Sequence, residues 1–318
     1  MTLDSPDLAT DQKVGGSSPS ERAQVDGPYL LRRALLLSLG AMPEASAADP
    51  GARARCMESC CAYACRVQTY VKRRSWPEPG SIPDVLDMFR CELRFYQEIA
   101  PEVGVRAPAC YRAEETAEGT LLVLEDLSAW QPGADPAIAA RVLTDMHKRW
   151  EGRARQNWPW LRADGAAIDL VEKLFDRTWP LLAARSDLTP SLRAIGERLL
   201  GHIADADEIA ARAGVPTLAH GDASMLNMRT SPDGQVALLD WEDVSSAPGI
   251  CDLAWMLVSS VDSGQWDEVI AAYGHSAGLA EVLPAAIVQG LFSLSDTPVG
   301  SEEATAWIDR IDAACSRL

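Results

Sequence analysis

The stretch His220-Gly221-Asp222-Ala223-Ser224-Met225-Leu226-Asn227 carries the strongest chemical signal in this chain. Asp222 and Asn227 are five positions apart, and Asp240-Trp241-Glu242 follows after twelve further residues. Asp240 comes directly after the apolar run Val236-Ala237-Leu238-Leu239, which predicts a short buried strand. The spacing therefore predicts a carboxylate and an amide on one loop, with a second carboxylate on a short strand beside it.

These side chains suit the transfer of a phosphoryl group, in which a protein mainly positions the reactants and neutralises charge. Asp222 would accept the hydrogen bond of the acceptor hydroxyl and help to deprotonate it, while Asn227 and Asp240 would hold Mg²⁺. The simpler alternative is a Gly-Asp turn in which Asp222 and Asn227 only hydrogen-bond to nearby backbone groups.

The pattern H-G-D-x-x-x-x-N followed by D-W-E resembles the aminoglycoside phosphotransferase and choline kinase superfamily of small-molecule kinases. The resemblance implies an α+β, bilobal, protein-kinase-like fold with a small N-terminal antiparallel-sheet lobe and a larger, mostly helical C-terminal lobe. It also implies ATP, or alternatively GTP, and Mg²⁺ as cofactors. His220 belongs to this catalytic loop, and we expect it to hold the loop rather than to move protons.

A second segment, Gly249-Ile250-Cys251-Asp252-Leu253-Ala254-Trp255, resembles the D-L-A segment of the same family. The resemblance implies that Asp252 braces the catalytic loop by accepting hydrogen bonds from backbone N–H groups. Asp252 is also a candidate N-cap for a helix that begins at Leu253, and the two roles are compatible.

The resemblance further implies a strand lysine that holds the α and β phosphates and a helical glutamate that orients it. Lys72 ends the segment Arg66–Lys72, where apolar and polar residues mostly alternate as in a half-buried strand. Glu92 lies in a segment with helical spacing from Met88 to Ala100, which resembles the E-x-x-F-Y-x-x-x-x-P helix of choline-kinase-like members. The alternative is that Lys72 and Glu92 are ordinary surface charges.

The segment from Thr120 to Ser128 predicts the last strand of the N-terminal lobe, running into the hinge. The resemblance implies that main-chain groups around Glu125 and Leu127 hold the adenine. The expected phosphate loop corresponds to Arg55–Cys65, which contains no glycine. Either Ser59 supplies a hydroxyl while backbone amides cradle the phosphates, or the nucleotide lobe is trimmed.

The same loop carries four of the eight cysteines, namely Cys56, Cys60, Cys61 and Cys65. A zinc site is one interpretation, but structural zinc sites favour closely spaced pairs that converge from two segments. Buried apolar thiols, or a redox-sensitive loop beside the nucleotide, are the other interpretations. The remaining cysteines lie scattered in apolar contexts, as is typical of a reduced cytosolic protein.

A chain of 318 residues is long enough for two lobes with separate cores. We expect a disordered tail at 1–27, a nucleotide-binding lobe at 28–127 and a catalytic and acceptor-binding lobe at 128–318. An apolar run after Arg32-Arg33 imitates a targeting signal, but it lies behind an acidic, Ser/Gly/Pro-rich stretch, so a secretory signal would require a mis-assigned start codon. A helix that packs on the N-terminal lobe fits this run better. No run of eighteen apolar residues occurs, which predicts no membrane span and a cytoplasmic location.

The C-terminal lobe shows helical periodicity outside the catalytic loop. The predicted helices cover Pro136–Glu151, Ile168–Leu182, Leu192–Ala211, Trp266–Tyr273, Val282–Leu294 and Ser301–Cys315. The first of these contains His147 in an L-x-x-M-H-x-x-W pattern that resembles a family helix. We therefore expect His147 to pack or to hydrogen-bond rather than to act as a base.

Charge is distributed unevenly along the chain. The net charge is −17, and residues 161–318 hold 10 Lys and Arg against 24 Asp and Glu. An acidic C-terminal half disfavours nucleic acid, whose binding needs Lys and Arg. It favours a cationic acceptor if carboxylates line the cleft, whereas acidic surfaces also serve solubility alone.

The sequence thus predicts an ATP-dependent O-phosphotransferase for a small hydroxylated molecule, acting without nucleic acid or membrane. Phosphorylation of an antibiotic, as in aminoglycoside-type resistance, and metabolism of an amino alcohol, sugar or nucleoside are equally compatible. The alternative is a kinase-like binding or scaffold protein with impaired catalysis. A protein kinase is disfavoured because Asp240 is followed by Trp-Glu rather than Phe-Gly and no A-P-E segment occurs.

Overall fold

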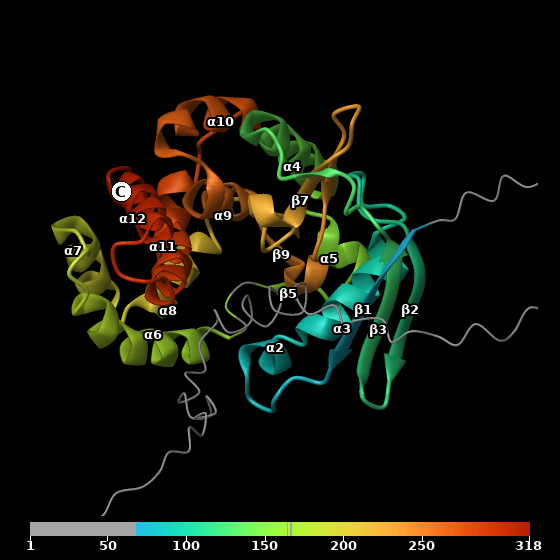
Figure 1. The fold of residues 1–318 in the computed structure, drawn as a ribbon, viewed down its shortest axis with the longest axis horizontal. Helices are drawn as coiled ribbons and strands as arrows, with labels where there is room; N and C mark the ends of the chain where they lie inside the picture. The colour runs from blue at the N-terminus through green and yellow to red at the C-terminus, as the bar shows by residue number, and fades with distance from the viewer. Residues whose placement is uncertain (1–67, 164, 166) are drawn as a thin grey trace, which may run out of the picture.

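The computed structural model describes residues 68–163, 165 and 167–318. Several features discussed above lie outside these residues, namely the tail 1–27, the helix expected after Arg32-Arg33, Ser59 and the cluster Cys56, Cys60, Cys61 and Cys65. The described part has an antiparallel sheet on one side and a mostly helical body on the other (Figure 1). The predicted α+β class is confirmed.

The N-terminal sheet has the strand order β1-β3-β2, with antiparallel pairing throughout. Its strands are β1 (Thr69–Ser75), β2 (Cys110–Thr116) and β3 (Gly119–Glu125). The apolar run of β3 makes it the central strand, and Lys72 of β1 lies opposite Leu122. Strand β1 extends three residues beyond the end predicted from sequence, through Arg73, Arg74 and Ser75.

A helix beside this sheet carries the predicted glutamate. It follows the short α2 (Ile82–Val85) and consists of α3 (Met88–Arg94) and a π-helical turn, η1 (Phe95–Ile99). The π turn closes with a hydrogen bond from the Ala100 N–H to the Phe95 carbonyl, 2.8 Å long. Helix α3 packs on β2 and β3, and the predicted end before Pro101 is confirmed.

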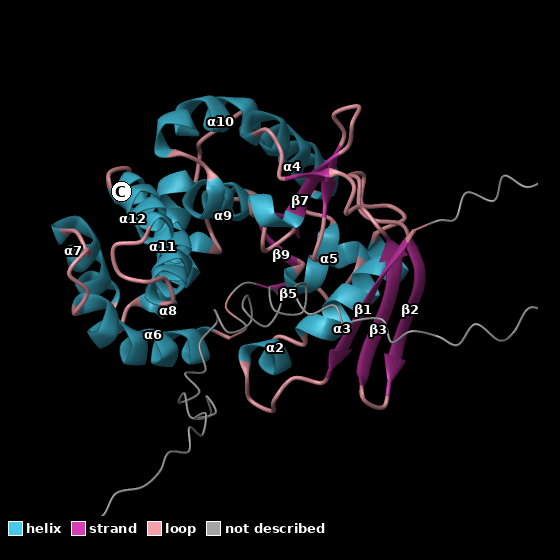
Figure 2. Cartoon of the chain, viewed as in Figure 1, coloured by secondary structure: helices cyan, strands magenta, loops and turns pink. Residues whose placement is uncertain are grey.

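The rest of the described chain holds helices and two further small sheets (Figure 2). The helices are α4 (Pro136–Trp150), α5 (Ala154–Asn157), α6 (Ile168–Ala183), α7 (Pro190–Leu199), α8 (Ile203–Ala210), α9 (Ile250–Ser260), α10 (Trp266–Tyr273), α11 (Leu279–Ser295) and α12 (Glu302–Cys315), with the 3₁₀ turns η2 (Met225–Asn227), η3 (Trp241–Asp243) and η4 (Ser263–Gln265). The sheets have the orders β4-β7-β8 and β5-β9-β6, from β4 (Gln131–Pro132), β5 (Arg162–Ala163), β6 (Pro216–Ala219), β7 (Met228–Thr230), β8 (Val236–Leu238) and β9 (Ser245–Pro248).

Five of the six helices predicted in this part are confirmed within three residues at each end. The single helix predicted over Leu192–Ala211 is wrong, because α7 ends at Leu199 and α8 begins at Ile203. Gly201 between them has a φ of +69°, a backbone conformation that interrupts a right-handed helix. Apolar periodicity alone did not reveal this break, since both helices bury an apolar face.

The core of the helical body is made by buried Leu, Ile, Val and Trp side chains of α9, α11 and α12 together with α4, α6 and α7. Helix α11 lies centrally, against α6, α8, α9 and α12. None of the helices in the described residues is both long enough and apolar enough to span a bilayer.

The close approach of α7 and α6 yields a stability prediction. A Cβ atom on Gly196 of α7 would overlap the ring of Trp179 of α6, which is buried. Gly196→Ala should therefore lower the free energy of unfolding by about 1–3 kcal/mol through overpacking, although alanine favours a helix by about 1 kcal/mol over glycine. Urea unfolding monitored by circular dichroism measures this change.

Gly264→Ala is the matched control, because a Cβ atom there would meet no atom within 4 Å. A Gly196→Ala protein as stable as the control would contradict the prediction, because it would show that α6 and α7 can move apart without loss of stability.

Candidate active site

The catalytic loop connects β6 to η2, and its backbone depends on a glycine. Gly221 has a φ of +85°, and a Cβ atom at this position would overlap the Asp243 carbonyl group. Only glycine fits both the conformation and the space.

Asp252 of α9 braces this loop, as the resemblance implied. Its carboxylate accepts hydrogen bonds from the backbone N–H groups of His220 (2.7 Å) and Gly221 (2.9 Å). It also contacts Nε2 of His147 at 3.0 Å. Burial opposes ionisation of Asp252, yet the hydrogen bonds from His147 and from the His220 backbone N–H hold its pKa below the ordinary value.

His147 plays the supporting role that was expected. Its ring lies buried on α4, where Nδ1 contacts the Tyr273 hydroxyl at 2.8 Å and Nε2 contacts Asp252. The two contacts fix the ring between α10 and α9. His147 therefore orients Asp252, which in turn holds the catalytic loop.

His220 is fully buried and bonded on both sides of its ring. Its Nε2 lies 2.9 Å from the Leu239 carbonyl, and its Nδ1 lies 3.3 Å from the Asp222 backbone N–H. These contacts fit a ring that carries a proton on Nε2 and accepts at Nδ1. His220 thus ties the catalytic loop to the residue that precedes Asp240.

Trp241 joins the helix formed by α3 and η1 to this loop. Its ring stacks on the Phe95 ring, with the ring centroids 4.0 Å apart and the planes at 8°. It also contacts the His220 ring, whose centroid lies 4.4 Å from its own. Trp241 and Phe95 are both fully buried, and the indole N–H donates to the Leu238 carbonyl at 3.1 Å. The stack connects η1, β8 and the loop in one rigid unit.

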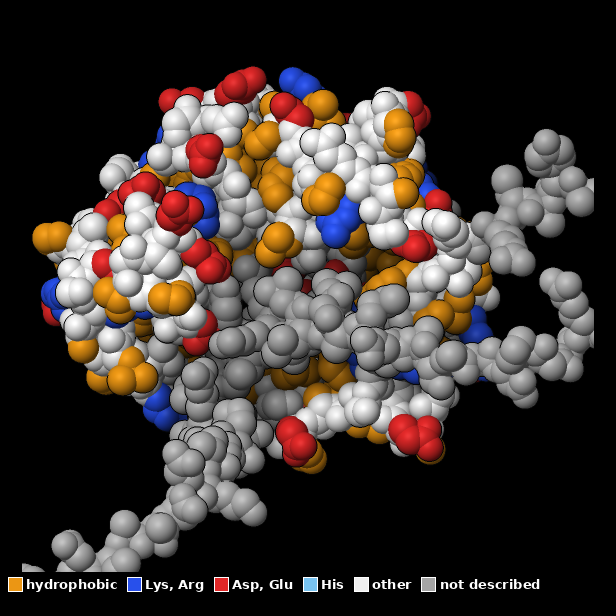
Figure 3. Space-filling view, viewed as in Figure 1, with side chains coloured by type: hydrophobic (Ala, Val, Ile, Leu, Met, Phe, Trp, Pro, Cys, Tyr) orange, Lys and Arg blue, Asp and Glu red, His pale blue; other side chains and the backbone are white. Residues whose placement is uncertain are grey.

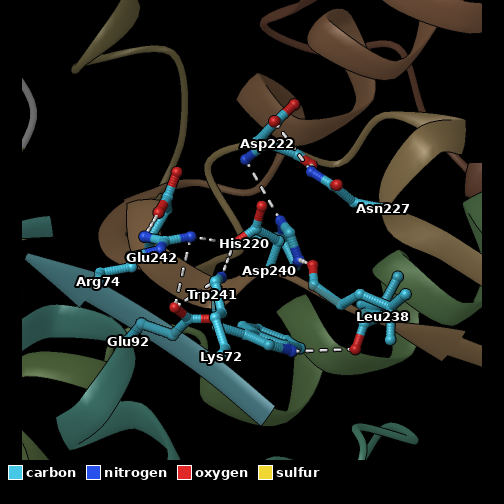
Figure 4. Close-up of polar contacts among 11 residues, drawn as sticks. Lys72, Arg74, Glu92, His220, Asp222, Asn227, Leu238, Asp240, Trp241 and Glu242 are labelled. Atoms are coloured by element: carbon cyan, nitrogen blue, oxygen red, sulfur yellow. Dashed lines mark hydrogen bonds and ion pairs between the residues drawn. The ribbon is translucent and has the colours of Figure 1, made fainter. Parts of the chain in front are cut away.

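Asp222 and Asn227 meet across the loop (Figure 4). The Asn227 amide nitrogen donates to an Asp222 carboxylate oxygen at 2.9 Å and to the Asp222 carbonyl at 3.0 Å. The indole N–H of Trp255, on α9, donates to the other carboxylate oxygen at 2.6 Å. Two N–H donors therefore set the orientation of the Asp222 carboxylate.

Lys72, Glu92 and Asp240 converge from β1, α3 and the loop after β8 (Figure 4). The Lys72 ammonium lies 2.8 Å from both Glu92 oxygens and 2.6 Å from Asp240 Oδ1. Glu92 is only 2% exposed, which excludes the alternative that these residues are ordinary surface charges. The pairing of lysine with helical glutamate is present as predicted.

Asp240 lies beyond the strand that was expected to carry it. Strand β8 ends at Leu238, and Asp240 has the left-handed backbone angles φ 60° and ψ 67°. A non-glycine residue rarely adopts this conformation, which often marks a functional site. Burial opposes ionisation of Asp240, but the Lys72 and Arg74 charges hold its pKa below the ordinary value.

Arg74 and Glu242 belong to the same cluster, although no role was predicted for either. The Arg74 guanidinium contacts Asp240 at 3.2 Å and pairs with Glu242, while it packs on the Phe89 ring at 4.7 Å. Arg74 is two residues after Lys72 on β1, so both side chains leave the strand on one face. Continued alternation beyond Lys72 was the signal that could have identified it.

The donor atoms at this position fit a hard divalent cation. Oxygens of Glu92, Asp240 and Glu242 lie within 4.8 Å of one another, and carboxylate and amide oxygens are the ligands that Mg²⁺ prefers. The Leu239 N–H donates to the Asn227 carbonyl at 2.8 Å, which keeps Asn227 beside Asp240. The Asn227 amide oxygen is the atom that such a cation would take. Asp240 thus lies in this group of donor atoms, and Asn227 is linked to it through the backbone of Leu239.

Glu125 and Leu127 lie where β3 ends, as predicted for a hinge. The Glu125 carboxylate pairs with Arg106 and accepts the Ala109 N–H at 3.0 Å. The Leu127 carbonyl accepts the Trp130 N–H at 3.0 Å, and the Leu127 side chain is buried. These contacts define the shape of the hinge, and their role toward adenine stays a prediction.

The position of Arg74 yields a prediction about cation binding. Arg74→Ala removes a positive charge from beside Asp240 and Glu242. Affinity for a divalent cation without nucleotide should rise by about tenfold or more, because charges this close interact by several kcal/mol even near a surface. Titration of Mn²⁺ followed by electron paramagnetic resonance measures the change directly.

Arg73→Ala is the matched control, since Arg73 is on the same strand but exposed. Equal Mn²⁺ affinity in the Arg74→Ala and Arg73→Ala proteins would contradict a charge-balanced cation site.

Asp252 yields a prediction about stability and pH. Because its pKa in the folded state is depressed, its contribution is present above the unfolded pKa near 4 and is lost as pH falls through the folded value. Asp252→Asn should lower the free energy of unfolding at pH 7 by about 1–3 kcal/mol. The difference from wild type should shrink as pH falls below about 4. Urea unfolding at a series of pH values measures it.

A difference between wild type and Asp252→Asn that stays constant across this range would argue against ionisation of Asp252 in the fold. Asp205→Asn, at an exposed position of α8, is the control.

Comparison with known proteins places these observations in a family. Residues 22–287 match the model of the phosphotransferase enzyme family. A comparison with curated proteins found no match. Aminoglycoside phosphotransferase APH(3'')-Id from Streptomyces rimosus, solved with ADP and streptomycin, has a TM-score of 0.51 and 16% identity over 70% of this chain and 86% of that chain.

Two further solved structures are similar to this chain. Spectinomycin phosphotransferase APH(9)-Ia, solved with ADP and spectinomycin, has a TM-score of 0.49 and 9% identity over 79% of this chain and 86% of that chain. Choline kinase LicA from Streptococcus pneumoniae has a TM-score of 0.48 and 16% identity over 79% of this chain and 87% of that chain. The family match covers well over half of the sequence. The chain therefore belongs to the phosphotransferase enzyme family and is a small-molecule phosphotransferase with a kinase-like fold.

Proposed function

We propose that this protein transfers the γ-phosphoryl group of ATP to a hydroxyl of a small molecule. The convergence of Lys72, Glu92 and Asp240 beside the Asp222–Asn227 pair is the observation that supports this most strongly. His220 and Leu239 join the two groups of residues through a 2.9 Å contact. A turn that only caps backbone groups would not require a lysine and a glutamate from the other side of the fold.

Each residue has a defined task in this proposal. Asp222 accepts the hydrogen bond of the acceptor hydroxyl and takes its proton as the hydroxyl oxygen bonds to the γ-phosphorus and the bond to the leaving ADP breaks. The N–H groups of Asn227 and Trp255 orient its carboxylate for this task. Lys72, released from Asp240, holds the phosphates while Glu92 keeps it oriented.

The cofactors follow from the donor atoms of the site. ATP supplies the phosphoryl group, and Mg²⁺ neutralises the charge on the phosphates. Asn227 and Asp240 would hold the metal, and Glu242 is a further candidate ligand. The hinge at Glu125 and Leu127 would face the adenine with main-chain groups, and GTP is the alternative nucleotide. Solved relatives contain ADP, which supports an adenine nucleotide.

Two classes of acceptor, antibiotics and metabolites, are compatible with this proposal. Solved relatives contain streptomycin or spectinomycin, and others are named as choline kinases. Acidic side chains lie scattered over the visible face of the helical body and are not confined to one patch (Figure 3). Net charge therefore gives only general support to a cationic acceptor. A cytoplasmic location fits the need for ATP, and no disulfide joins the four cysteines of the described residues.

The proposal is tested by ATP consumption with Mg²⁺ against aminoglycosides, nucleoside and peptide antibiotics, amino alcohols and sugars. Asp222→Asn should lower kcat by about 10²–10⁴-fold on the acceptor that is used, because it removes the base. Its affinity for ATP–Mg²⁺, measured by calorimetry, should stay within about twofold of wild type, since Lys72 keeps its contacts with Glu92 and Asp240.

Lys72→Met is the companion variant, and its ATP affinity should fall because the phosphates lose their cation. Full turnover by Asp222→Asn would exclude Asp222 as the base. Absence of both turnover and ATP-dependent thermal stabilisation in wild type would favour a scaffold role.

A further inference from the structure

A cavity lies next to the catalytic loop, on the side of the helical body. Its volume is about 240 Å³, and its walls come mainly from α6, α8, α9 and α11. Two lining residues connect it to the proposed base, because Gly221 precedes Asp222 and Trp255 donates a hydrogen bond to the Asp222 carboxylate. Gly221 and Trp255 therefore form the part of the cavity wall next to Asp222, from which an acceptor hydroxyl would reach this carboxylate.

The walls of this cavity are largely apolar. On α11, Val282, Ala285 and Ala286 share one helix face, and on α8, Ile203 and Ala210 do the same. Small side chains at these positions create the space, since valine and alanine reach less far than leucine or phenylalanine. Such a wall suits rings or alkyl groups, and its polar side chains, among them Ser245, Gln289 and Asp207, are few compared with the many hydroxyl and ammonium groups of a polycationic sugar.

Most of the charged groups that line the cavity are already paired. Asp243 pairs with Arg162 at 2.9 Å. Asp252 accepts the loop N–H groups and contacts His147. Two of the three lining carboxylates are therefore occupied by groups of the protein itself.

Asp207 of α8 is the third lining carboxylate and differs from the other two. It is half-buried, at the position one helical turn after Ile203, and within the described residues no hydrogen bond or ion pair reaches its side chain. Burial without a compensating cation raises the pKa of this carboxyl above its ordinary value. An ammonium group beside Asp207 would offset that desolvation.

We propose that the acceptor is a mostly apolar, hydroxylated molecule with a single basic nitrogen, whose ammonium pairs with Asp207 while its hydroxyl lies at Asp222. This assignment rests on the proposed phosphotransferase function and narrows its acceptor class. An apolar wall with one unpaired carboxylate selects a monocation with an apolar body over a polycation or a neutral polyol. In this proposal the single carboxylate of Asp207 attracts the cationic acceptor, and the net negative charge of the C-terminal half is not required for it.

The test uses the full chain saturated with Mg²⁺ and a non-hydrolysable ATP analogue. The probes are phenyl- and alkyl-substituted aminocyclohexanols, their N-acetyl derivatives, which lack the charge, and streptomycin as a polycation. Binding is measured by calorimetry for wild type, Asp207→Asn and Ala285→Leu. Asp205→Asn is the matched control, because Asp205 is exposed on the same helix and does not line the cavity.

We expect the amines to bind more tightly than their N-acetyl derivatives and than streptomycin. Asp207→Asn should weaken amine binding by about 10- to 100-fold, the range for a hydrogen bond to a charged group, and leave the N-acetyl derivatives unchanged. Ala285→Leu should weaken binding of both forms, because it fills the apolar space. The control should match wild type.

Equal amine affinity in wild type and Asp207→Asn would overturn the proposal, as would tighter binding of streptomycin than of every amine. Binding of the ATP analogue without binding of any amine at about 10 mM would also overturn it, since affinity weaker than the millimolar range gives no specific recognition. Failure to bind the ATP analogue itself would instead count against the proposed function, so the two failures are distinguishable.

Discussion

The described structure depends on a cluster in which two cations meet three carboxylates in a partly buried site. Lys72 and Arg74 come from one strand, Glu92 from a helix, and Asp240 and Glu242 from the loop that follows β8. Charges at this burial are stable only when they are paired, and removal of one partner from such a pair costs about 3–5 kcal/mol. The sheet, the helix and the loop must therefore be placed together. The same requirement brings the proposed metal ligands and the phosphate-binding lysine to one point.

A second layer of residues holds this cluster beside the proposed base. Trp241 packs between the ring of Phe95 and the ring of His220, and Asp252 anchors the backbone of the catalytic loop. These residues do not need to touch a substrate to matter for the reaction. Phosphoryl transfer depends on placement, so a shift of the loop would separate the base from the metal ligands. The buried histidines thus act as hydrogen-bonding supports, with His147 behind Asp252 and His220 behind Asp240.

The carboxylates of this chain fall into two groups with different roles. On the face of the helical body that Figure 3 shows, carboxylates are dispersed among other side chains and act mainly as solvated groups. In the sites, most carboxylates are paired with arginine, lysine, histidine or backbone N–H groups. Asp207 differs because its surroundings are apolar and it has no partner among the described residues. Local pairing, rather than net charge, is therefore the property that bears on acceptor selection.

The sequence by itself indicated the catalytic loop and most helices of the C-terminal part, whereas the family resemblance implied the Lys72–Glu92 pairing and the bracing role of Asp252. The loop motif and the helices depend on fixed spacings within one motif or on the period of one helix, and both are local properties of a chain. The pairing of Lys72 with Glu92 joins a strand and a helix, so no local spacing determines it. The break at Gly201 was missed because helical periodicity continues in the apolar residues on both sides. Arg74, Glu242 and the cavity beside Asp207 were decided only by the tertiary structure. Their surroundings combine segments more than a hundred residues apart, and no local pattern records which charges become neighbours when such segments pack together.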